Sequence, residues 1–151
     1  MIKKLSVYAS KNFTINKPVI HKIVASLKDE LGFSISSLQY NFVSPEEIHT
    51  INKKYLKHDF TTDIITFNYS GKNDILEGEI FISVEDARQN SKKFKVSLDN
   101  EIIRLVVHGI LHLIGYDDKS SADKKKMKKE ENRLLNLLIE NFNGRITQYG
   151  S

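Results

Sequence analysis

One segment of the chain, 98–114, limits the possible folds more than any other because it predicts a helix that is apolar around much of its surface. Successive helical residues lie about 100° apart, so its apolar side chains cover roughly half of the circumference. The polar side chains share a stripe about 80° wide on the opposite side: Glu101, Arg104, His108 and His112. Such a helix needs apolar partners, which places it at the centre of a domain.

The two histidines of this stripe have the spacing of a metal-binding pair. His108 and His112 are one helical turn apart, the separation at which two imidazoles can bind one ion. Gly109 and Gly115 border the stripe, and we expect them to leave room beside the rings. A single histidine would more often be an ordinary polar residue, but this pair favours a metal site.

The residues that follow the helix offer a third ligand. Gly115-Tyr116-Asp117-Asp118 is typical of a helix end that turns back, and such a turn can bring a carboxylate to the ion. Three protein ligands with an open fourth position are typical of a catalytic metal site.

The rest of the chain predicts an α+β fold in a single domain, 1–151, with a small mixed β-sheet packed against several helices. The helices are expected near 16–32, 45–55, 85–94, 98–114 and 121–142, and the strands near 38–42, 64–69 and 79–84. A polar loop is expected at 57–62. The first two helices carry clear start signals, Asn16 with Pro18 and the capping box Ser44-Pro45-Glu46-Glu47.

Composition narrows the class of site and the compartment. The chain has no cysteine, so disulfides and thiolate ligands are excluded. We find no signal peptide and no apolar run of the roughly 20 residues that span a membrane, so a cytoplasmic protein is expected. The net charge is +4, and six of the lysines lie between Lys119 and Lys129. These lysines either contact a nucleic acid or form a solvated helix face balanced by Glu130 and Glu131.

The run from His108 to Asp118 resembles the H-G-x-L-H-L-x-G-Y-D-H signature of the YbeY-type endoribonucleases, the bacterial rRNA maturation factors. Segment 55–67 and the run Gly78-Glu79-Ile80 are also similar to family segments. The resemblance implies a single-domain α+β metalloprotein: a zinc-dependent, single-strand-specific endoribonuclease of 16S rRNA 3′-end maturation and ribosome quality control. Its implied partners are ribosomal RNA and the small ribosomal subunit.

Two positions depart from the family pattern. Asp118 stands where the signature has its third histidine, and the register favours it over the adjacent Asp117 as the third ligand. The resemblance therefore implies one Zn²⁺, or another divalent transition metal, held by His108, His112 and Asp118. Leu56 stands where the family has an arginine expected to touch RNA phosphate, so other cations must supply that attraction.

Other charged residues and histidines have roles that the sequence alone does not decide. Arg104 either contacts a phosphate near the metal or pairs with Glu101 or Glu79. Asp117 is the candidate proton acceptor or water-orienting group. Asp63 and Glu79 either orient the ligands or are ordinary strand-end residues. The remaining histidines, His21, His49 and His58, have no partner pattern and are interpreted as incidental.

Three other functions compete with a nuclease. A metalloprotease would need a glutamate where Gly109 stands. A non-haem iron oxygenase could use two histidines and a carboxylate, but the repeated strands of a jelly roll are missing from the pattern. A non-enzymatic ribosome-binding or rRNA-binding assembly factor would hold a structural metal, for which four protein ligands are usual. A metal-dependent endoribonuclease is the function that we predict.

Overall fold

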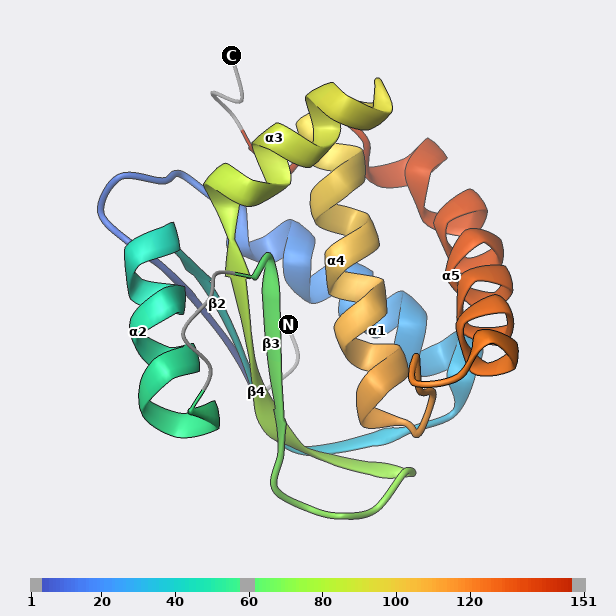
Figure 1. The fold of residues 1–151 in the computed structure, drawn as a ribbon. Helices are drawn as coiled ribbons and strands as arrows, with labels where there is room; N and C mark the ends of the chain where they lie inside the picture. Colours follow the sequence, from blue (N-terminus) through green and yellow to red (C-terminus); the bar gives the residue numbers. More distant parts are fainter. Residues whose placement is uncertain (1–3, 58–61, 148–151) are drawn as a thin grey trace.

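The computed structural model describes residues 4–57 and 62–147. Its centre is a four-stranded sheet with the order β1-β2-β4-β3 (Figure 1). The three strands β1 (Leu5–Ala9), β2 (Ser34–Val43) and β4 (Ile75–Ser83) are parallel, and β3 (Ile64–Asn68) pairs antiparallel with β4. The predicted mixed sheet and α+β class are confirmed.

Helices cover both faces of this sheet (Figure 1). Helix α2 (Pro45–Leu56) lies on one face, while α1 (Lys17–Leu31) and α4 (Leu98–Leu113) lie on the other. Helix α5 (Ser121–Phe142) packs outside α4 and α1, and α3 (Val84–Phe94) crosses near the first turns of α4. The predicted central helix is therefore α4, which lies between the sheet and α5.

The helix starts follow the local signals in the sequence. Asn16 accepts a hydrogen bond from the Val19 backbone N–H, and Ser44 forms a capping box with Glu47. Both contacts satisfy N–H groups that have no partner within the helix. Gly32 ends α1 with φ +75°, a left-handed conformation that glycine adopts without steric cost.

Burial confirms how α4 and α5 were assigned. The apolar side of α4 is fully buried in the main core, together with Ile80 and Ile82 of β4. A smaller cluster beneath α2 contains Val43, Ile48 and Ile65. The apolar face of α5 packs against the main core through Met127, Leu134, Leu138 and Phe142.

Some predicted boundaries were wrong. Strand β1 was not predicted, β2 starts at Ser34 rather than near 38, and β4 runs from Ile75 to Ser83 rather than 79–84. Val84 already belongs to α3, because Ser83 is its N-cap and accepts from the Asp86 N–H. Most of the loop expected at 57–62 lies outside the described residues. Within the described ranges, no helix is both long and apolar enough to cross a membrane.

Candidate metal centre

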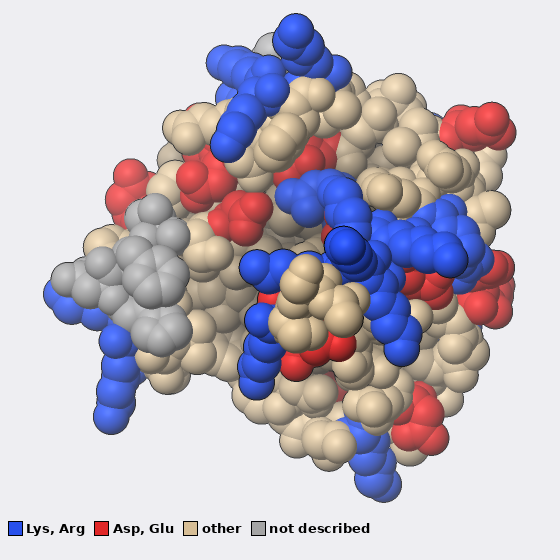
Figure 2. Space-filling view, turned by 45° about the vertical axis from the view of Figure 1, so that its right-hand side comes forward, with Lys and Arg blue, Asp and Glu red and all other residues tan. Residues whose placement is uncertain are grey.

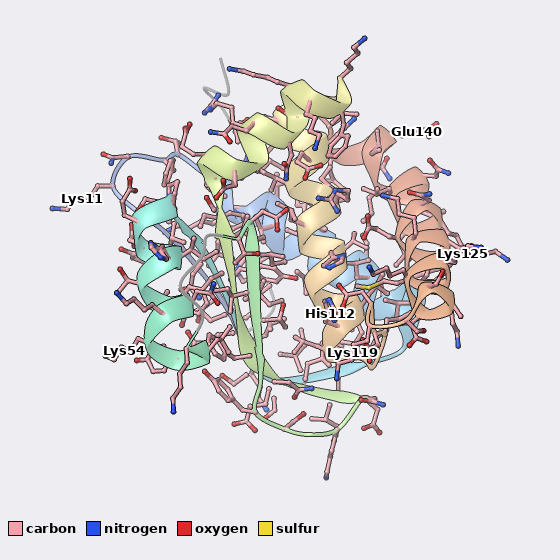
Figure 3. All side chains as sticks on the ribbon, viewed as in Figure 1. Lys11, Lys54, His112, Lys119, Lys125 and Glu140 are labelled. Carbon is pink, nitrogen blue, oxygen red and sulfur yellow. The ribbon has the colours of Figure 1, made fainter. Side chains whose placement is uncertain are left out.

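Helix α4 presents both histidines at its C-terminal end, beside β3 and the turn into α5. His112 is labelled there in Figure 3. The rings of His108 and His112 have centroids 4.8 Å apart and an interplanar angle of 77°. Gly109 lies against the sheet, where a Cβ would be 2.8 Å from Ile80 Cδ1. The expectation that Gly109 leaves room beside the histidines was therefore wrong, because it allows close packing of α4 on β4.

A tight turn after α4 returns the chain to the histidines. Gly115 has φ +110°, and its backbone N–H donates to the His112 carbonyl at 3.1 Å. An L side chain rarely adopts this φ, and a Cβ here would also lie 2.9 Å from Asn73 Nδ2. The turn places Asp118 Oδ2 3.8 Å from His112 Nε2.

The three residues offer ligand atoms that all lie within 4.8 Å of one another. Two ligand atoms of one zinc ion lie at most twice the zinc–ligand distance of about 2.0–2.2 Å apart. A small movement of a side chain would therefore bring all three ligand atoms within reach of one ion. The Asp118 side chain is 53% exposed and can rotate towards the rings, whereas both rings are largely buried. His108, His112 and Asp118 could therefore hold a divalent ion, as the sequence predicted, and the assignment stays a prediction.

These residues line one wall of a hollow of about 530 Å³. The opposite wall comes from β3, from the segment that precedes it and from the end of α2. Leu56, which stands where the resemblance implies an arginine, lies in this wall. Other lining residues are Asn52, Thr62, Asp63, Ile64, Thr66 and Asn68. An ion at the histidines would face a space large enough for a small part of a substrate.

A buried glutamate orients the first histidine. Glu131 Oε2 of α5 is 2.8 Å from His108 Nδ1, and the Glu131 side chain is 3% exposed. Burial raises the pKa of Glu131, but the hydrogen bond to His108 and the charge of Arg104 outweigh it and lower the pKa below its usual value. An ionised carboxylate only accepts, so Nδ1 donates, which leaves Nε2 as the ring nitrogen that would bind an ion. Such pairs are common around metal-bound histidines.

Sequence reasoning missed Glu131 because it considered this residue, with Glu130, only as a possible part of a solvated helix face. A signal was present: Glu131 follows Met127 by four residues and precedes Leu134 by three, so it occupies the apolar stripe of α5. A charged residue at such a position is rarely buried unless it is paired.

The second histidine favours its neutral form. Burial lowers the pKa of His112, and the charge of His108 lowers it further, while Asp118 acts in the opposite direction. The net direction is downwards. A neutral imidazole has the free lone pair that a metal ion needs.

Arg104 lies one turn before His108 and is surrounded by carboxylates. Its guanidinium donates to both carboxylate oxygens of Glu101 and to Glu131 Oε1 at 3.3 Å. Asp63 Oδ2 is 3.8 Å from Arg104 Nη2. Of the two partners expected from the sequence, Glu101 is therefore present. Glu79 instead accepts from the Tyr69 hydroxyl at 3.2 Å.

The remaining predicted residues lie in different parts of the structure. Asp117 accepts from the Lys119 N–H at 2.9 Å and lines a different hollow, so its catalytic role stays a prediction. Asp63 lies in the wall of the metal hollow and accepts from Asn90 at 3.1 Å. His21 is buried in α1, and its Nδ1 has no hydrogen-bond partner among the described residues. His49 lies on α2, and His58 falls outside the described residues.

Comparison with known proteins places this chain in a family. The sequence model of the family described as "Endoribonuclease YbeY" matches residues 5–139. An Endoribonuclease YbeY from Parabacteroides distasonis is 37% identical over 126 residues, which cover 83% of this chain and 88% of that protein. The Endoribonuclease YbeY of Flavobacterium johnsoniae is 44% identical over 113 residues, covering 75% and 77%.

A solved structure is similar in fold. The solution structure of TM1509 from Thermotoga maritima covers 93% of this chain and 92% of its own, with a TM-score of 0.67 and 22% identity. At this identity the likeness supports the architecture alone. The family match extends across nearly all of the described fold and includes the histidine segment of α4. The chain therefore belongs to the YbeY endoribonuclease family, as its signature residues predicted.

Proposed function

We propose that this protein is a metal-dependent, single-strand-specific endoribonuclease whose ion is held by His108, His112 and Asp118. The observation that carries the proposal is the convergence of these three ligands at the wall of an open hollow, with His108 oriented by a buried glutamate. Three ligands facing an open space suit catalysis better than a structural role.

The residues around the ligands would have distinct tasks. A divalent ion held here would supply Lewis acidity to a phosphodiester and to water. Glu131 keeps the Nε2 lone pair of His108 directed to the site, and Arg104 holds Glu131 in place. Asp118, the most exposed ligand, has the freedom to adjust as RNA enters. Asp117 remains the candidate for receiving a proton or orienting water.

RNA attraction would come from lysines near the centre. Figure 2 shows basic side chains gathered at α3, at the top of the view, and over α5 to the right of the centre. Five lysines of α5, Lys124, Lys125, Lys126, Lys128 and Lys129, are exposed. Each lysine contact to a single-stranded phosphate contributes about 0.7 to the slope of log affinity against log salt. These contacts would supply the attraction to phosphate that the resemblance assigns to an arginine at position 56, where this chain has Leu56.

Zinc is the proposed ion, and ribosomal RNA in the small subunit is the proposed substrate. Two imidazoles and one carboxylate form a ligand set that binds zinc. The family match supports an endoribonuclease, and the resemblance of the α4 signature adds 16S rRNA 3′-end maturation and ribosome quality control. Processing of a 16S precursor to a mature 3′ end by the zinc-loaded protein would test the substrate.

The primary experiment measures cleavage of two matched RNA substrates. Metal-free protein is loaded with zinc and incubated with a single-stranded RNA and with its duplex, and His112→Ala is run beside it. We expect cleavage of the single strand only, and no cleavage by the variant. Equal cleavage by His112→Ala would overturn the site. Tight RNA binding without cleavage at any metal load would favour the non-enzymatic assembly factor.

A further inference from the structure

A second cleft lies beside the metal hollow, between α3, α4 and α5. Its volume is about 510 Å³. The apolar part of its wall comes from α3, the turn after it and α5: Phe94, Val96, Leu135 and Ile139. Phe94 and Val96 are 57% and 43% exposed, which is high for apolar side chains that line a concave surface. This cleft contains none of the proposed metal ligands.

The other part of the wall is polar and held in place. The Asn90 amide donates to Asp63 Oδ2 at 3.1 Å and to Glu101 Oε2 at 3.3 Å, so its orientation is fixed. Arg104 and Asn100 lie beside it on α4. Arg104 contacts the two carboxylates in this wall, with Nη2 3.8 Å from Asp63 Oδ2 and hydrogen-bonded to Glu101 Oε2. An occupant would therefore meet an apolar surface with an aromatic ring on one side and oriented hydrogen-bonding groups on the other.

Cations border this cleft on two sides. Lys92, Lys93 and Lys95 at the end of α3 are exposed, and Lys93 Nζ lies 5.5 Å from the centre of the Phe94 ring. Lys128 of α5 lies in the opposite wall. Figure 2 shows basic side chains over both helices. This combination suits a planar, uncharged ring with a polar edge that is attached to an anionic backbone.

The cleft is also within reach of a strand bound at the metal. Asp63 lines both the cleft and the metal hollow. Arg104 precedes His108 by four residues, about 6 Å along the helix axis. A nucleotide next to the reacting phosphate could therefore place its base between Phe94 and the polar wall. Single-stranded RNA is commonly recognised in this way, by stacking on aromatic side chains and hydrogen bonds to base edges.

We propose that this cleft binds one unpaired nucleobase of the RNA substrate, with Phe94 as the stacking residue. The inference rests on the proposed endoribonuclease function and extends it, because it assigns a residue that fixes the register of the strand at the metal. A base held here selects single-stranded RNA, since a base in a duplex is not free to enter.

Binding and cleavage of RNA with a single abasic nucleotide would test the proposal. A short single-stranded RNA is prepared as a series, with the abasic nucleotide at a different position in each member. Affinity is measured by fluorescence anisotropy with metal-free full-length protein, so that binding is separated from cleavage. For the wild type, we expect one abasic position to weaken binding about 5- to 150-fold, the range for loss of one stacked base.

Three variants assign that loss to the cleft. Phe94→Ala should bind intact RNA as weakly as the wild type binds RNA that is abasic at the sensitive position. An abasic nucleotide at that position should not lower the affinity of Phe94→Ala any further. Phe94→Tyr keeps an aromatic ring and should restore the wild-type pattern. The matched control is Tyr8→Ala, since Tyr8 is a 50% exposed aromatic residue on β1 at the other edge of the sheet. It should behave as the wild type.

The possible results separate this proposal from the nuclease proposal. If an abasic nucleotide lowers the affinity of the wild type but not that of Phe94→Ala, the base site is supported even if no metal produces cleavage. If the protein cleaves RNA but no abasic position lowers its affinity, the base site is overturned while the nuclease stands. The same conclusion follows if an abasic nucleotide lowers the affinity of Phe94→Ala as much as that of the wild type. Unchanged RNA affinity in Phe94→Ala would also overturn it and would favour a peptide as the occupant of the cleft.

Discussion

The two halves of the polar stripe on α4 have opposite character. In the N-terminal half, Glu101 is 2% exposed, and Arg104 binds it together with Glu131. In the C-terminal half, the ligand atoms of His108 and His112 face an open hollow beside Asp118, whose side chain is 53% exposed. The same helix therefore carries a cluster of charges that pair with one another and, one turn later, candidate metal ligands that face an open hollow.

This difference indicates which half holds the site in place and which half reacts. Buried charges are tolerated only when they are paired and hydrogen-bonded, so the contacts of the first half hold its side chains in place. Glu131 joins the halves, because it accepts from Arg104 and from His108. Changes in the C-terminal half should therefore remove metal binding without loss of the fold, whereas changes in the first half should reduce stability.

The largest effect is expected for His112→Ala. Only two ligands would remain, so metal binding and cleavage should both fall below detection. The free energy of unfolding should change by about 1 kcal/mol or less, because the His112 ring is partly exposed. Metal content, cleavage and denaturant unfolding would be measured on the same sample. His49→Ala, a histidine on α2, is the control and should keep its metal; a normal metal content in His112→Ala would refute the assignment.

Glu131→Ala should affect both halves. It leaves Arg104 and His108 without their shared carboxylate, and loss of one partner of a buried ion pair costs about 3–5 kcal/mol. The milder Glu131→Gln should lower metal affinity about 10- to 100-fold. Thermal unfolding and metal titration measure the two effects.

Glu140→Ala is the matched control for this pair, since Glu140 is an exposed carboxylate near the end of the same helix (Figure 3). Its stability should stay within about 0.5 kcal/mol of the wild type. If Glu131→Ala were as stable as Glu140→Ala, the two halves would not be coupled through this residue.

Arg104→Lys distinguishes a positioning role from a phosphate contact. Lysine keeps the charge but cannot bind Glu101 and Glu131 together, so stability should fall by about 1.5–3 kcal/mol, the range for one charged hydrogen bond. Metal should still bind. A direct phosphate contact would instead appear as a large loss of kcat with unchanged stability, and cleavage at the wild-type rate would remove Arg104 from the reaction.

The smallest effect is expected for Asp117→Ala. It removes the hydrogen bond from the Lys119 N–H, which contributes about 0.5–1.5 kcal/mol, and should leave metal affinity unchanged.

The neighbouring residue should behave differently. Asp118→Ala should weaken metal binding, while Asp118→His should retain zinc. A metal titration of the three variants tests the register, which would be wrong by one residue if Asp117→Ala were the damaging change.

Sequence patterns predicted the helices better than the strands. Caps and apolar spacing defined α1, α2, α4 and α5, because both signals are local in the chain. Strand β1 has five residues at the edge of the sheet, with buried and exposed positions mixed, and it pairs with a segment more than 30 residues away. Such pairing leaves little local signal.

Sequence patterns brought together the three candidate ligands, whose assignment stays a prediction, but not the residues that support them. His108 and His112 are one helical turn apart, and Asp118 follows shortly after the end of the helix, so their convergence could be expected. The contact from Glu131 to His108 depends on how α5 packs against α4, and the sequence alone suggested a solvated charge. The partners of Arg104 were predicted in part, since Glu101 is one turn away, whereas Asp63 and Glu131 come from distant segments.

Zinc titration of the metal-free protein during RNA cleavage tests the central claim most directly. A single-stranded RNA is held in excess, and the initial rate is followed as zinc is added to the full chain. We predict no cleavage without metal, a rate that rises to a plateau at one ion per chain, and a weaker zinc dependence in Asp118→Ala. Full cleavage in the absence of metal, or a saturated site that never cleaves RNA, would contradict the account.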